Sequence, residues 1–288
     1  MHSLDNDVLV SAVTRNGAIH LRRGGTSVVI DAQTGSIPAI VHWGPDLGEA
    51  DASTLDSLAI ATRPQRVSGG LDETPRLRTV TTAADGWFGT PTLAGHRGGL
   101  SFSTSFTAPS SASPRTETTS DGIAIFLTDD EGGLTARVEL QLGASGLLRQ
   151  RITIRNVGET PYTVDALNLL FPLPWDATEI LDTTGRHLRE RSAQRSELTF
   201  GTHLRESRRG RPGADSTLLL AAGTPGFGFE SGLVHGIHVA WSGNQRAFAE
   251  RATTGESLLG GGELYLPGEI VLGHGEELSS PWVLGSWG

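Results

Sequence analysis

The stretch LTARVELQL at residues 134–142 decides the fold class, because apolar and polar side chains alternate along it without a break. A period of two places all the apolar side chains on one face of a β-strand. Residues 148–155 repeat the alternation after a Gly-rich turn, and residues 123–127 precede it through a loop of Asp and Gly. The three segments predict an antiparallel meander with one face on a core and the other in solvent.

Short apolar runs between turn residues continue this pattern along the chain. Only residues 53–61 have helical spacing, with Asp51 or Ser53 as the cap and Pro64 as the stop. Residues 107–122, rich in Ser, Thr and Pro, predict a mobile surface loop. Many short strands without βαβ alternation predict an all-β fold, a large antiparallel sandwich with one short helix. The other predicted strands lie at residues 19–21, 28–30, 40–43, 102–106, 162–171, 218–222, 227–229, 234–241, 264–266 and 270–272.

The composition excludes several classes of chemistry and of partner. The 288 residues include no cysteine, and all 23 basic residues are arginine. Thiolate catalysis, disulfides and Schiff-base chemistry therefore have no residue to support them. The formal net charge of -9 argues against a nucleic-acid partner, and no apolar run approaches the roughly 20 residues of a membrane span. An acidic start unlike a signal peptide favours a cytoplasmic location, and the lack of lysine favours a GC-rich bacterial source.

No motif for a self-contained active site is found. The chain lacks the Gly-x-Ser-x-Gly elbow of α/β-hydrolases, and the glycines at 260–262 precede an apolar run rather than a helix. His235 and His238 are three residues apart on a predicted strand, so their side chains point to opposite faces and cannot share a metal. We expect neither a metal nor a cofactor.

Eight arginines interleaved with three glutamates form the densest polar cluster, at residues 186–211. One interpretation is a solvated loop with internal ion pairs, which contribute little when exposed. The other is a docking surface for another domain or subunit, because a guanidinium pairs bidentately with a carboxylate when it is partly buried. The sequence leaves both open.

The loop DGWFGTP at residues 85–91 carries two adjacent aromatic side chains between glycines. Trp87 and Phe88 are expected to be exposed, since the apolar core of a sandwich comes from its strands. Exposed rings beside Asp85, His96 and Arg97 suit sugar recognition, in which a ring stacks on C–H groups and polar side chains bind hydroxyls. The alternative is a plug that covers one end of the sandwich.

Short motifs spread along the chain resemble, in the same order, those of α-galactosidases of glycoside hydrolase family 36. The likeness covers nearly the whole chain, and six or more motifs in register are more specific than any one of them. The motifs are WGPDL at 43–47, LDTTGRH at 181–187, RRGRPGAD at 208–215, WSGN at 241–244, ER at 250–251, LPGE at 266–269 and SPW at 280–282, together with the loop at 85–97.

The resemblance implies that residues 1–288 are one domain, an N-terminal β-supersandwich of galactose-mutarotase-like architecture. The family's catalytic (β/α)₈ barrel and its small C-terminal β-domain are absent from this chain. The two catalytic aspartates lie in that barrel, and the nucleophile's Lys-Trp-Asp setting cannot occur in a chain without lysine. Trp175-Asp176 falls within the sandwich pattern, so we assign no catalytic residue.

In the family, the parent enzyme hydrolyses terminal non-reducing α-galactosyl residues of melibiose- and raffinose-like sugars with retained configuration and no cofactor. By that resemblance the partners would be the α-galactoside substrate through the missing barrel, the barrel itself, and other copies in a homo-oligomer. Asp85, Trp87 and Phe88 are the candidates for a wall of the galactose subsite or its aglycone side.

Two alternatives remain at this stage. A freestanding carbohydrate-binding β-sandwich would share the fold and the exposed rings. A mutarotase-like epimerase would need a histidine acid and a glutamate base facing one pyranose, with His96 or His187 as the histidine.

Overall fold

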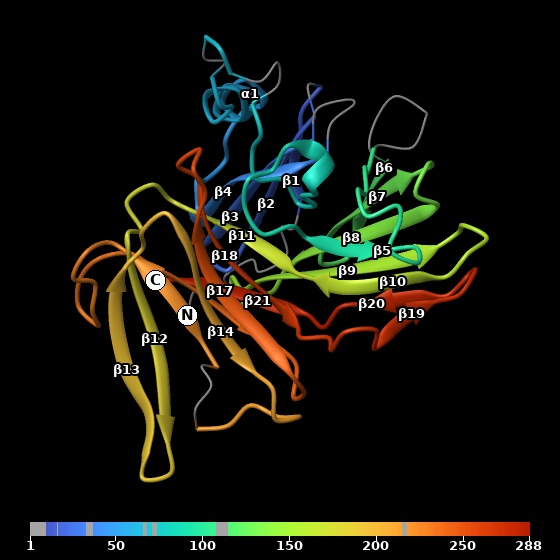
Figure 1. Cartoon of the computed structure of the whole chain (residues 1–288). Coiled ribbons are helices and arrows are strands. Elements are labelled where there is room, and N and C mark those ends of the chain that lie inside the picture. The colour runs from blue at the N-terminus through green and yellow to red at the C-terminus, as the bar shows by residue number, and fades with distance from the viewer. Residues whose placement is uncertain are drawn as a thin grey trace.

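The computed structural model describes residues 10–15, 17–32, 37–65, 68–70, 74–107, 115–214 and 218–288. These residues form antiparallel sheets with one α-helix, which confirms the all-β prediction. The largest sheet spans the molecule from β13 at one side to β6 at the other (Figure 1). In spatial order its strands are β13 (Arg189–Glu197), β12 (Glu179–Arg186), β15 (Leu220–Gly223), β16 (Val234–Val239), β21 (Val283–Trp287), β9 (Leu148–Asn156), β8 (Leu134–Leu142), β7 (Gly122–Asp129) and β6 (Arg115–Thr119), with β20 (Glu277–Ser279) also paired to β9.

Three smaller sheets pack around the large one. The first consists of β1 (Val10–Val13), β2 (Ala18–Arg23), β3 (Thr26–Asp31) and β4 (Ala39–Pro45). The second has the order β11 (Leu169–Leu173), β18 (Ser257–Glu263), β17 (Gln245–Arg251) and β14 (Gly201–Ser207), and it packs against β15 and β16. The third has the order β19 (Ile270–Leu272), β10 (Tyr162–Leu167) and β5 (Leu93–His96).

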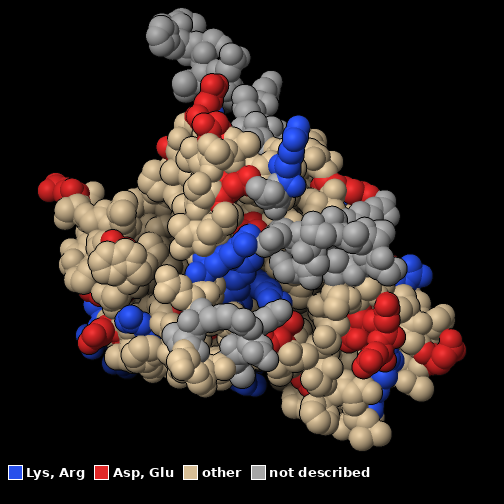
Figure 2. All heavy atoms as spheres, turned by 90° about the horizontal axis from the view of Figure 1, so that it is seen from above, with Lys and Arg blue, Asp and Glu red and all other residues tan. Residues whose placement is uncertain are grey.

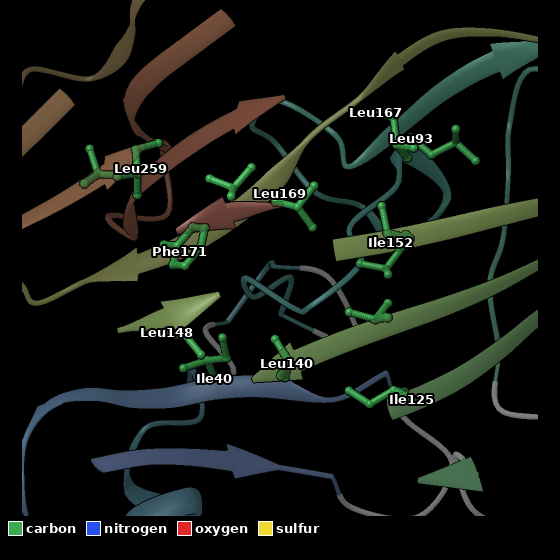
Figure 3. Packing of buried hydrophobic residues seen from close by; sticks show 14 of the residues in the cluster. Ile40, Leu93, Ile125, Leu140, Leu148, Ile152, Leu167, Leu169, Phe171 and Leu259 are labelled. Carbon is green, nitrogen blue, oxygen red and sulfur yellow. The ribbon is translucent and has the colours of Figure 1, made fainter. Parts of the chain in front are cut away.

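The core is one continuous apolar cluster to which all four sheets contribute. Side chains from β4, β8, β9 and β11 lie together in it, as Ile40, Leu140, Leu148 and Phe171 show (Figure 3). The meander supplies them by alternation: the apolar positions of 134–142 are buried, whereas Arg137 is exposed. The alternation in the sequence therefore places apolar side chains on the buried face of the sheet and polar side chains on the other face.

The glycines at 260–262 form the middle of strand β18 rather than a phosphate loop. A Cβ on Gly260 would lie 2.3 Å from the Phe248 ring, and one on Gly262 would lie 2.3 Å from the Leu167 carbonyl oxygen. The run of glycines thus lets an aromatic ring and a neighbouring backbone approach the strand closely.

Helix α1 (Ala52–Ala61) confirms the predicted helix. Asp51 is its N-cap, accepting a hydrogen bond from the Thr54 backbone N–H at 2.7 Å, and the helix ends three residues before Pro64. Leu55 and Ala59 are the side chains it buries, against β2 and β3.

Part of the predicted surface loop at 107–122 is a strand. Residues 115–119 form β6, which pairs along its length with β7, while residues 108–114 lie outside the described residues, as does Asp215 of the motif at 208–215. The Ser- and Thr-rich composition misled the prediction because an edge strand needs backbone pairing but no apolar face.

Other strand predictions were wrong in informative ways. Residues 102–106 form no strand, and residues 227–229 and 264–266 lie in turns and loops whose backbone N–H groups bond elsewhere; for example, Gly228 donates to Ser231 and Leu264 donates to Asn244. The predicted strand at 162–171 is split at the buried Asn168, whose N–H bonds to Thr92. Residues 186–211, for which a solvated loop was one of two interpretations, contain β13 and the whole of β14.

Candidate functional site

The short 3₁₀ turn η1 (Ala83–Asp85) and the loop that follows it hold the three predicted substrate-binding residues, Asp85, Trp87 and Phe88. Trp87 was expected to be exposed, but it is only 7% exposed and packs with Leu77, Leu170 and Phe248 in a small apolar cluster. Its Nε1 donates to the Thr90 carbonyl at 3.2 Å. The reason lies in the tertiary structure. The loop packs on the sheet formed by β11, β18, β17 and β14, whose apolar side chains cover Trp87, and the local sequence does not reveal this contact.

A buried carboxylate on β17 fixes this loop. Glu250 is 3% exposed and accepts hydrogen bonds from the Thr90 backbone N–H at 2.7 Å, from the Thr90 hydroxyl at 2.5 Å and from the Thr202 hydroxyl at 2.8 Å. Glu250 belongs to the motif at 250–251, but its role could not be predicted, because nothing near residue 250 indicates that residue 90 lies beside it.

Phe88 and Asp85 occupy different environments on the same loop. Phe88 is 60% exposed, so its ring is available at the surface between the two anchored residues Trp87 and Thr90. Asp85 accepts hydrogen bonds from the Thr82 N–H and hydroxyl, and it pairs with Arg78 at 3.6 Å. The structure therefore presents Phe88 and uses Asp85 to build the turn that precedes it.

His96 and Arg97, the polar neighbours predicted for this loop, lie at the end of β5. His96 accepts a hydrogen bond from the Gly99 N–H and lies 3.9 Å from the Asp165 carboxylate. The Arg97 guanidinium donates to the Gly132 and Gly133 carbonyls and to the Asn156 side chain, and its carbon lies 5.4 Å from the Tyr162 ring centroid. Arg97 thus ties loops together.

The arginines of the cluster lie on the β12–β13 hairpin, on β14 of another sheet and in the residues that follow β14. β13 is the edge strand of the large sheet, and all nine of its residues are exposed. Figure 1 shows the β12–β13 hairpin extending away from the body of the molecule. Arg195 bridges back to the core by pairing with Glu179 at 2.7 Å and stacking over the Phe227 ring. A long charged edge resists uncontrolled strand pairing and leaves its side chains free to meet a specific surface.

A polar clamp joins this hairpin to the neighbouring sheet. Asp182 on β12 is 1% exposed, and it accepts a hydrogen bond from His203 at 2.7 Å and another from Arg205, both on β14. Although burial opposes ionisation, these hydrogen bonds hold the pKa of Asp182 below its ordinary value. Arg205 also donates to Gln194 of β13, so the clamp reaches both strands of the hairpin.

His235 and His238 lie on opposite faces of β16, as their spacing predicts. His235 is buried, contacts the Trp43 carbonyl at 3.3 Å and meets the Trp43 ring edge-on, while His238 bonds to the Leu218 carbonyl. Within the part of the chain that the structure describes, no group of three or more His, Asp or Glu is arranged to hold a metal ion. No described helix is long and apolar enough to cross a membrane.

Acidic and basic groups are interspersed over the face seen from above, where arginines gather near the middle of the surface (Figure 2). Two of the molecule's arginines, Arg63 and Arg76, converge on the buried Asp31 at 3.2 and 2.9 Å.

Comparison with known proteins identifies the family to which the chain is related. The model of the glycosyl hydrolase family 36 N-terminal domain matches residues 36–273. An α-galactosidase from Escherichia coli is 32% identical over 245 residues, which covers 85% of this chain and 32% of that protein. The chain thus spans about a third of the length of this curated relative.

Solved structures of α-galactosidases share the fold. The enzyme AgaB from Geobacillus stearothermophilus superposes with a TM-score of 0.77 at 20% identity, covering 97% of this chain and 41% of that one. The enzyme from Lactobacillus brevis gives 0.78 at 17% identity, covering 96% of this chain and 40% of that one. These structures share the fold, and the match to the family model shows that the chain belongs to the glycosyl hydrolase family 36 N-terminal domain family.

Proposed function

We propose that this chain is the non-catalytic N-terminal domain of a longer, retaining α-galactosidase that hydrolyses terminal α-galactosyl residues of melibiose- and raffinose-type sugars. The observation that carries the proposal is the family match over residues 36–273, joined to a relative that is itself an α-galactosidase about three times as long. The same proposal includes a bacterial, cytoplasmic enzyme; the absence of lysine supports the bacterial source and the absence of cysteine supports the cytoplasmic location.

The environment of the buried carboxylates supports a non-catalytic role. A retaining glycosidase needs two carboxyl groups about 5–5.5 Å apart, one as nucleophile and one as acid and base. Asp31, Glu139 and Asp182 are each neutralised by arginine, whereas Glu250 and Asp129 accept several hydrogen bonds from neighbouring loops. Each of these groups is committed to holding elements together.

Within this proposal, the loop bearing Phe88 contributes to the entrance of the active site. Its exposed ring is held on a rigid base by Trp87 and Glu250, which is what an aromatic wall for a sugar needs. Trp87 would act as the anchor and Asp85 as the turn former, rather than as sugar-facing groups. The exposed hairpin β12–β13 would meet the barrel or a neighbouring subunit.

The direct test is hydrolysis of p-nitrophenyl α-galactoside by the purified chain. We expect no nitrophenolate above the buffer rate, and we expect an open frame encoding a barrel with a Lys-Trp-Asp motif to follow the codon for Gly288. Hydrolysis by the purified chain that is lost when a single Asp or Glu among residues 1–288 is changed would overturn the proposal that this domain is non-catalytic.

The role of the loop is testable in an enzyme that contains the barrel. Phe88→Ala is expected to raise KM for raffinose several-fold, because a stacked ring contributes about 1 kcal/mol to binding. Phe229→Ala removes an even more exposed ring from another loop and serves as the control. Kinetics of Phe88→Ala that match the parent would remove Phe88 from the proposed wall.

A further inference from the structure

A hollow of about 630 Å³ lies on the solvent-facing side of the meander formed by β7, β8, β9 and β20. We call it the meander hollow. These four strands lie side by side at the end of the large sheet opposite the β12–β13 hairpin (Figure 1). The volume falls in the range of small-ligand sites, roughly 300–1,000 Å³.

The register of the strands builds the floor of the hollow in rows. Phe126 pairs with Arg137, Arg137 with Thr153, and Thr153 with Ser279, so these four side chains form one row across four strands. Side chains directly opposite each other on one face are about 4.5–5.5 Å apart at Cβ, so the row is continuous.

The next row follows two residues further along each strand. Thr128 pairs with Thr135, Thr135 with Arg155, and Arg155 with Glu277. All four side chains line the hollow together with the first row. The floor therefore alternates hydroxyls, guanidinium groups, a carboxylate and one partly exposed aromatic ring.

A third row fixes one wall. Arg151 donates through Nε and Nη2 to the buried Glu139 at 2.9 and 2.8 Å, and its guanidinium lies 4.5 Å from the Trp282 ring centroid. The guanidinium that enters the hollow is thus held between a carboxylate and an indole, and it needs no rearrangement to accept a ligand.

The charge balance of the hollow selects the ligand. The three arginines of the rows stand beside Glu139, Glu277 and Asp130, so a phosphate would meet carboxylates and a metal cation would meet guanidinium groups. An apolar ligand would remove water from the charged groups of Arg155 and Glu277 without offering them a hydrogen bond. A neutral polyol both donates and accepts hydrogen bonds, and its C–H faces suit an aromatic ring.

We propose that the meander hollow binds a neutral oligosaccharide. Arg137, Arg155 and Glu277 would bind sugar hydroxyls, and Phe126 would lie against a ring face. The proposal concerns residues that have no part in the Phe88 loop, and it does not depend on the chain belonging to an α-galactosidase.

The test is binding by the whole chain to raffinose, maltotriose and cellotriose, measured by titration calorimetry and saturation-transfer NMR. Because the hollow is open and polar, we expect at least one trisaccharide to bind with a dissociation constant on the order of 1 mM, while inorganic phosphate does not. Thr153→Trp fills the centre of the floor, and Arg137→Ala removes one donor from it. Each is expected to weaken binding at least about tenfold.

Matched controls carry the same changes on the distant hairpin. Ser192→Trp places an indole on another solvent-facing strand, and Arg186→Ala removes another exposed guanidinium. Both should bind as the parent chain does, and unchanged melting curves check folding. The proposal is overturned by failure of all three trisaccharides at about 50 mM, by binding of phosphate alone, or by undiminished binding in a folded Thr153→Trp variant.

Discussion

At the scale of the residue, Gly89 has little freedom, since it lies between the exposed Phe88 and the bonded Thr90. A Cβ there would lie 2.0 Å from Glu250 Oε1 and 2.8 Å from Trp87 Nε1. The Glu250 carboxylate is buried and holds three hydrogen bonds, so it cannot move aside without losing them. Glycine is therefore required by close approach, not by backbone conformation.

Gly89→Ala is expected to lower the free energy of unfolding by about 1–3 kcal/mol, because the added methyl group must displace the loop or the carboxylate. Urea denaturation at neutral pH measures it. Gly228→Ala is the control, since a Cβ there meets nothing within 4 Å. Equal stability of the two variants would mean that the loop is not held against Glu250.

At the scale of the element, the β12–β13 hairpin depends on polar contacts. β13 buries no side chain, and β12 buries only Ile180 and Asp182. Burial of apolar surface therefore contributes little to the stability of the hairpin. The bonds from His203 and Arg205 to Asp182 fasten it to the neighbouring sheet. A buried carboxylate paired in this way stabilises only while it is ionised.

Asp182→Asn is expected to cost about 2 kcal/mol at neutral pH, because the neutral amide lacks the charge that strengthens the hydrogen bonds from His203 and Arg205. The pKa of Asp182 is lowered in the folded chain, so its stabilisation is complete above the ordinary carboxyl range and is lost as the pH falls through the folded value.

Denaturation curves from about pH 7 down to about pH 2.5 test this. The variant should lose less stability than the parent chain at the acid end. Asp165→Asn, at a half-exposed carboxyl, should keep the parent's pH dependence. A variant whose acid limb matches the parent's would show that Asp182 does not supply it.

At the scale of the whole molecule, buried histidines lie within the first sheet and where that sheet meets the large one. His20 is fully buried and bonds to Ser27 at 2.8 Å, and His235 packs against Trp43 where the first sheet meets the large one. Burial lowers the pKa of His20, His42 and His235, so the folded chain holds all three neutral more firmly than the unfolded chain does.

The stability of the molecule should therefore fall as the pH drops below the unfolded histidine pKa of about 6.5, since the unfolded chain then binds more protons. Linkage limits each histidine to about 1.4 kcal/mol per pH unit. Urea midpoints at about pH 7.5 and 5.5 measure the difference. His235→Gln should reduce it, whereas His187→Gln, at an exposed side chain, should not.

Much of the fold was readable in advance because the meander carries its own pattern. Alternation at 134–142 and 148–155 fixes which face is buried whatever packs on it, and helix α1 follows from Asp51, its apolar spacing and Pro64. Strand β13 carries no alternation of its own, and only pairing with β12 makes it a strand. Residues 227–229 look like a strand but bond as a turn.

The candidate site, like the fold, could be predicted only in part from the sequence. The sequence by itself determined the two aromatic residues between glycines, the family motifs and the absence of cysteine and lysine, because these are properties of composition and local order. Only the tertiary structure decided that Trp87 is buried and Phe88 exposed, since Glu250 and Phe248 come from a strand about 160 residues away in sequence. The meander hollow likewise depends on the tertiary structure. The hydrogen-bonded register of four strands brings side chains that are far apart in the sequence next to one another on one face of the sheet.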